Sequence, residues 1–115
     1  MILILNNSVS KNDPLSYNNK IKSALKKLNI PHISVSKIKN INLSKILGII
    51  ITGSSIKLSR ESKKGNFYKY AFNIYYLSKL KVPVLGMCFG CQLLNIIYGG
   101  SLIDNKKYIC ENIII

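Results

Sequence analysis

Short apolar runs, separated by longer segments of mixed polarity, set the pattern of this chain. Four runs of four to six residues stand at positions 2–5, 32–35, 46–51 and 82–87. β-branched side chains dominate the run over 46–51, and such residues are enriched in strands. Because runs of this length are too short for a typical helix, each of them predicts a buried strand.

The segment after the first run has the features of a helix. Asp13 followed by Pro14 is typical of a helix start, with the aspartate as the cap and the proline in the first turn. Ile21, Leu25 and Leu28 then repeat at i, i+4 and i+7. We therefore expect this helix to bury one apolar stripe.

Two more helices are predicted in the second half of the chain. One is expected over 67–77, after a polar loop over 52–66, and the other over 89–98, where Gly99–Gly100 should end it. Strands that alternate with helices pair in parallel through right-handed crossovers. The pattern predicts an α/β fold, with an open, mostly parallel sheet and helices on both faces.

The length of 115 residues is typical of one domain. No apolar run approaches the roughly 18 residues needed to cross a bilayer. The apolar start at 2–5 has no basic residue before it and no cleavage site after it, so it predicts a strand and not a signal peptide. We expect a soluble, cytoplasmic protein that has no contact with a membrane.

The formal net charge of +13 raises the question of nucleic-acid binding. The 17 basic residues are scattered and form no cluster interleaved with aromatic side chains. Isoleucine, lysine and asparagine supply 49 of the 115 residues, which is the bias that an A/T-rich genome produces. We therefore attribute the charge to composition and do not expect nucleic-acid binding; the scarcity of acidic residues stays open.

Candidate chemistry concentrates in one segment, residues 83–94, with the sequence PVLGMCFGCQLL. An apolar strand runs into Gly86-x-Cys88-x-Gly90, and a helix begins at once. This is the cysteine form of a nucleophile elbow, in which glycines on both sides relieve crowding at a sharp turn. A helix N-terminus favours a thiolate, and the N–H that follows the nucleophile faces a developing oxyanion.

The extended motif resembles the glutaminase motif of class I glutamine amidotransferases. Residues 2–6 resemble the first strand of that family, and residues 48–55 resemble its oxyanion strand and loop, so the likeness covers most of the chain in the family's order. The resemblance implies a flavodoxin-like fold, glutamine as substrate, and no cofactor or metal.

The resemblance also implies a role for several residues. Cys88 matches the nucleophile that attacks the side-chain amide of glutamine. The N–H groups of Phe89 and Ser54 match the oxyanion donors, Gly53 matches the glycine that lets the loop approach the substrate, and Gln92 matches a residue that holds it. The common pattern has glycine at position 54 and proline at position 55, whereas this chain has serine at both, so the loop geometry is in doubt.

The greater departure is the absence of the His-x-Glu pair that the family places late in the domain. His32 is the only histidine, and it should start its strand whereas Cys88 follows the end of another, which places them too far apart for proton transfer. The apolar end at 113–115 looks like a strand without its neighbours. We expect a truncated amidotransferase-like domain over 1–115 that lacks its C-terminal part and is not a competent glutaminase alone.

Other interpretations stay open. The chain is a fragment of a working protein, a naturally short binding protein that has lost hydrolysis, or a half-domain completed by another polypeptide. In a working protein a synthase subunit would accept the ammonia. Cys88-x-x-Cys91 also has the spacing of a redox dithiol. A zinc site is not expected, because it needs four ligands and only this pair has suitable spacing.

Overall fold

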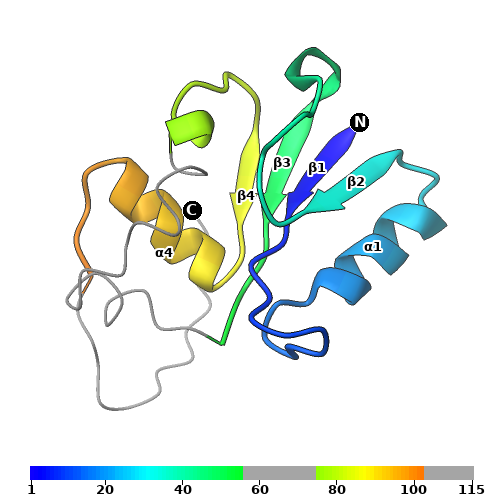
Figure 1. Ribbon diagram of the computed structural model, residues 1–115, viewed down its shortest axis with the longest axis horizontal. Helices are drawn as coiled ribbons and strands as arrows, with labels where there is room; N and C mark the ends of the chain where they lie inside the picture. The colour runs from blue at the N-terminus through cyan, green and yellow to red at the C-terminus, as the bar shows by residue number, and fades with distance from the viewer. Residues whose placement is uncertain (56–74, 103–115) are drawn as a thin grey trace.

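The computed structural model describes residues 1–55 and 75–102 of the chain (Figure 1). The elements in chain order are β1 (Ile2–Leu5), α1 (Asn18–Lys27), β2 (His32–Val35), the 3-10 helix η1 (Leu43–Lys45), β3 (Gly48–Ile51), β4 (Val84–Gly86) and α4 (Phe89–Ile97). Residues 75–77 are helical as well. All four predicted strands are present, the last two within shorter bounds than predicted.

The strands form one parallel sheet in the order β2-β1-β3-β4. The register sets His32 beside Ile2 at the start of the sheet. The last row at the other end consists of Val35, Leu5, Ile51 and Gly86. The carboxyl ends of all four strands therefore lie at the same edge of the sheet. Strands β1 and β3 are the central ones. In parallel α/β sheets this edge is where ligands bind.

Helices α1 and α4 lie on opposite sides of the sheet (Figure 1). Successive residues of a strand point to opposite faces. Ile4 packs with Ile21 and Leu25 of α1, whereas Leu3 and Leu5 belong to the larger cluster on the other face. This arrangement confirms the predicted α/β class, with a parallel sheet and helices on both faces.

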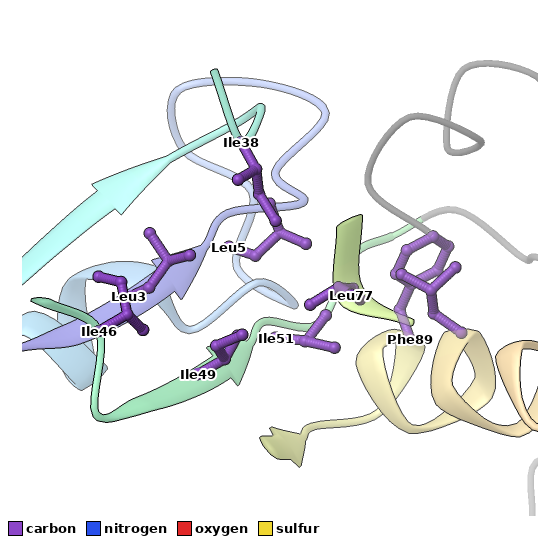
Figure 2. Packing of buried hydrophobic residues seen from close by; sticks show 9 residues of the cluster. Leu3, Leu5, Ile38, Ile46, Ile49, Ile51, Leu77 and Phe89 are labelled. Carbon is purple, nitrogen blue, oxygen red and sulfur yellow. The ribbon is translucent and has the colours of Figure 1, made fainter. Parts of the chain in front are cut away.

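The larger cluster holds α4 against the sheet (Figure 2). Phe89 and Leu93 of α4 are 1% and 0% exposed, and they pack with Ile49 and Ile51 of β3 and with Leu77. Each such side chain contributes roughly 1.5–3 kcal/mol when fully buried. Phe89 and Leu93, which lie one helical turn apart, therefore anchor α4 to the sheet.

The predicted start of the first helix is wrong. α1 begins at Asn18, and its N-cap is Tyr17 with φ 58°, which makes no side-chain capping bond. Asp13 instead uses its carboxylate within the loop before the helix. The predicted stripe is also shorter, because the helix ends at Lys27 and Leu28 is 67% exposed.

The end of α4 follows the prediction. Gly99 has φ 85°, which glycine adopts without strain. Its N–H donates to Ile96 O at 3.0 Å, and the N–H of Gly100 donates to Asn95 O at 2.8 Å. These two bonds form a Schellman motif, which satisfies carbonyl groups at the helix end.

Several expectations lie outside the described residues, namely most of the helix over 67–77, the loop beyond Ser55 and the apolar end at 113–115. Within the described residues, no helix is long and apolar enough to cross a membrane.

Candidate active site at the carboxyl edge of the sheet

Cys88 lies at a sharp turn between β4 and α4. The N–H of Met87 donates to Ile51 O at 3.0 Å, so pairing with β3 continues to the residue before the cysteine. The N–H of Gly90 then donates back to Met87 O at 2.8 Å, which closes the turn. Cys88 itself has φ 50° and ψ −109° and is the N-cap of α4. Such a backbone conformation costs a non-glycine residue of order 1–3 kcal/mol.

Two glycines make this turn sterically possible. A Cβ placed on Gly86 would lie 2.7 Å from Cys91 N and 2.7 Å from the carbonyl carbon of Gly90. A Cβ on Gly90 would overlap the carbonyl oxygen of Ile51. All of these contacts are with backbone atoms, which cannot move aside as a flexible side chain does. Helix α4 thus starts directly against β3 and β4, with the exposed Cys88 at the corner.

The segment after β3 runs past this corner. A Cβ on Gly53 would lie 3.6 Å from Cys88 Cβ and would overlap the carbonyl oxygen of Leu15. Gly53 is buried between the cysteine and the loop that follows β1. The carboxyl ends of β1, β3 and β4 therefore meet at Cys88. Ligands of parallel sheets bind at this edge.

Thr52 fixes the start of the segment over 52–55. Its N–H donates to Leu5 O at 3.0 Å, and its hydroxyl donates to Gly53 O at 3.1 Å. The same hydroxyl accepts a hydrogen bond from the backbone N–H of Asn7 at 2.8 Å. The carbonyl oxygen of Thr52 accepts one from the side-chain Nδ2 of Asn7 at 3.1 Å. With 0% exposure, Thr52 has no water to replace these partners.

Asp13 fixes the other end of the segment, a role that sequence analysis missed. Its Oδ2 accepts from Ser55 N at 3.1 Å, Ser55 Oγ at 3.3 Å and Val9 N at 3.2 Å, and its Oδ1 accepts from Leu15 N at 3.1 Å. The Asp13 side chain is 7% exposed. Burial alone would raise its pKa, but the hydrogen bonds from these donors outweigh burial and hold the pKa of Asp13 below its ordinary value.

The predicted oxyanion and substrate residues gather around Cys88. Phe89 is the first residue of α4, and Ser54 follows Gly53, with 8% exposure. Ser54 does not have a positive φ, so serine causes no backbone strain at this position. Gln92 is exposed one helical turn after Cys88, and its N–H donates to Cys88 O at 3.1 Å.

His32 lies far from this corner, as predicted. It pairs with Ile2 at the start of the sheet, and its Nδ1 lies 2.9 Å from Ile30 O. The strand order sets β2 three strands from β4. Three spacings of about 4.8 Å amount to about 14 Å before the length of the strands is added. A proton donor or acceptor must lie within roughly 3 Å, or one water, of its partner.

Cys91 is also free and exposed, near the start of α4. Both thiols of the Cys88-x-x-Cys91 pair are therefore accessible to reagents. In residues 1–55 and 75–102, no three His, Cys, Asp or Glu side chains gather where they would hold a metal ion.

A cavity of about 570 Å³ lies over the loop after β1 and the start of α1. Its lining includes Asp13 and Tyr17 and the basic residues Lys11 and Lys20. Cys88 does not line it, so this cavity adjoins the candidate site without containing the thiol.

The parallel sheet with helices on both faces defines an α/β protein, and the candidate site lies at the β4–α4 turn, where Cys88 stands beside the buried Gly53. The sequence profile of the family described as "Glutamine amidotransferase class-I" matches residues 12–113. The chain therefore belongs to the class I glutamine amidotransferases.

Three curated proteins are similar to the chain. A GMP synthase [glutamine-hydrolyzing] of Dictyostelium discoideum is 36% identical over 87 residues, which cover 76% of this chain and 11% of that protein. A GMP synthase [glutamine-hydrolyzing] of Borreliella burgdorferi is 35% identical over 80 residues, 68% of this chain and 14% of that protein. A putative glutamine amidotransferase of Schizosaccharomyces pombe is 39% identical over 51 residues, 44% of this chain and 18% of that protein.

The matched region thus covers between 11% and 18% of the length of these relatives. No solved structure shows a significant match to the chain.

Proposed function

We propose that the chain supplies the nucleophile and oxyanion elements of a glutaminase site, with Cys88 as the nucleophile. The observation that carries this proposal is the position of the Cys88 side chain, at a strained strand-to-helix turn beside the buried Gly53. The glutamine-hydrolysing activity in the names of two relatives supports glutamine as the substrate. A nucleophilic thiol works only while reduced, which fits a cytoplasmic location.

The proposed chemistry begins with attack of the Cys88 thiolate on the side-chain carbonyl carbon of glutamine. A C–S bond forms, and the carbonyl π electrons move to the oxygen. The N–H groups of Phe89 and Ser54 would stabilise this oxyanion, and loss of one such donor typically costs 10²- to 10³-fold in rate. Collapse then breaks the C–N bond, and the nitrogen must receive a proton to leave as ammonia. Water finally cleaves the thioester and releases glutamate.

Gln92 and Gly53 are the residues that we propose to contact the substrate. Gln92 lies one turn along the helix that begins at Cys88, so its side chain is on a neighbouring part of the same exposed surface. Gly53 presents no side chain where the substrate carbonyl would approach. Cys88 is exposed, so glutamine has access to the thiol.

We propose that the protonation step needs a group other than His32, because this single histidine lies at the opposite end of the sheet from Cys88. General acid–base help contributes about 10²- to 10⁴-fold. We propose that it comes from another polypeptide or a further part of the protein, and that a synthase subunit accepts the ammonia. The pure chain should release no steady ammonia from glutamine; steady release that Cys88→Ser abolishes would contradict this.

A non-catalytic protein that binds glutamine is the second candidate, favoured by the position of His32 at the far end of the sheet. A chloroketone analogue of glutamine separates the two. Its alkylating carbon forms a C–S bond as chloride leaves, without a general acid. The proposal predicts one adduct on Cys88 by peptide mapping, absent in Cys88→Ser and retained in Cys91→Ser. Labelling that follows Cys91 would favour a redox dithiol, and no labelling of Cys88 would favour binding alone.

A further inference from the structure

Asp13 is a buried acidic residue whose hydrogen-bond partners include a residue far away in the sequence. It is the only acidic residue within 1–55 and 75–102, and its side chain is 7% exposed. A buried carboxylate is costly unless its oxygens are hydrogen-bonded. Four hydrogen bonds satisfy this one, and two of them reach Ser55, 42 positions further along the chain.

The Asp13 carboxylate bonds to two loops, its own loop through Val9 N and Leu15 N and the segment after β3 through Ser55. Oδ1 accepts from Leu15 N, and the carbonyl of the same residue, Leu15, is the atom that a Cβ on Gly53 would overlap. Oδ2 accepts from both the N–H and the hydroxyl of Ser55. Asp13 thus supports the residue before Ser54 through Leu15 and holds the residue after it directly.

We propose that Asp13 is a positioning residue that sets the orientation of the Ser54 N–H relative to the sulfur of Cys88. This inference rests on the proposed function, because it assigns Asp13 to the oxyanion loop of that site. Oxyanion donors act only when they lie at about 2.7–3.1 Å from the developing charge. A loop released at Ser55 keeps its covalent chain but loses this alignment. The carboxylate itself does not touch the substrate.

The test uses a γ-(4-nitrophenyl) ester of glutamate and the full 115-residue chain. The Cys88 sulfur attacks the ester carbonyl, a C–S bond forms, and 4-nitrophenolate leaves without needing a proton. This acylation passes through an oxyanion and needs no histidine. The rate of the nitrophenolate burst is compared with the rate of Cys88 alkylation by iodoacetamide, which forms no tetrahedral oxyanion. Cys88→Ser gives the background for both.

The expected result is that Asp13→Ala slows the burst by about tenfold or more, a share of the effect of losing one oxyanion donor. Iodoacetamide labelling of Cys88 should change by less than about twofold, because exposure and the helix N-terminus govern that rate. Asp13→Glu should recover part of the burst rate. Asn12→Ala, an exposed neighbour in the same loop, should leave both rates unchanged.

Three results would overturn the inference: a burst in Asp13→Ala at the wild-type rate, equal slowing with both reagents, or no recovery in Asp13→Glu. If Asp13→Ala does not fold, Ser55→Ala decides instead, because it removes only the hydroxyl bond to Asp13. That variant should slow the burst and leave iodoacetamide labelling unchanged, and an unchanged burst would count against the inference. A wild-type chain with no burst above Cys88→Ser would instead reject the proposed function.

Discussion

The two segments that meet at Cys88 are held in place by different kinds of interaction. The turn over 86–90 is set by short-range sterics, because Gly86 and Gly90 leave room that any side chain would fill. The segment over 52–55 is set by partners 42 and 45 positions away, Asp13 and Asn7. A turn that is set by local sterics can be recognised in the sequence by its glycines. A loop that is held by hydrogen bonds to distant residues has no such sequence pattern.

The largest expected effect is on the locally built turn. Gly90→Ala should lower the free energy of unfolding by about 3 kcal/mol or prevent folding, because its Cβ would overlap the Ile51 backbone. Gly48→Ala is the matched control: its Cβ would meet Ile2 Cδ1 at 3.3 Å and Pro83 O at 3.5 Å, so it should cost about 1 kcal/mol or less. Urea unfolding measures both. Equal losses would show that the turn is not sterically special.

The second largest effect is expected for Asp13, which holds the segment over 52–55 by long-range hydrogen bonds. Asp13→Asn should lower the free energy of unfolding by about 2 kcal/mol at neutral pH, because an amide nitrogen would face backbone donors. The pKa of Asp13 is lower in the folded state, so its stabilisation is complete above the unfolded value of about 3.9 and is lost as pH falls through the lower, folded value. Urea midpoints of the two proteins should therefore converge only below about pH 4. Convergence at neutral pH would contradict this account.

Thr52→Val tests the other fixed end of the same segment. Valine keeps the shape but leaves the N–H of Asn7 without its acceptor, so a loss of about 1–2 kcal/mol in unfolding free energy is expected. Thr52→Ser keeps the hydroxyl and should cost less. Thermal unfolding followed by circular dichroism compares the pair, and the same loss in both would show that the methyl group, not the hydroxyl, matters.

The smallest effect is expected for Ser55→Ala. It removes one hydroxyl bond of 3.3 Å but leaves the N–H of Ser55 on Asp13, so a loss of about 0.5 kcal/mol in unfolding free energy is expected. A double-mutant cycle with Asp13→Asn should show coupling between the two positions. Additive losses would mean that the hydroxyl does not act through the carboxylate.

Sequence reasoning succeeded where structure follows from local pattern. Apolar runs located the strands, and glycine spacing located the turn at Cys88 and the end of α4. It failed at Asp13, because Asp-Pro has the same letters in a helix cap and in a loop that bonds to Ser55. The structure removes the doubt that serine at position 54 raised about the loop, because Ser54 does not take a positive φ.

We propose that the thiol of Cys88 stands in a site that recognises glutamine. Alkylation by iodoacetamide, read separately at Cys88 and Cys91 by mass spectrometry with and without millimolar glutamine, tests it most directly. We expect glutamine to slow the reaction at Cys88 and to leave the rate at Cys91 unchanged. The Asn12→Ala control should show the same slowing at Cys88 as the wild-type chain. Equal rates at Cys88 with and without glutamine would contradict it.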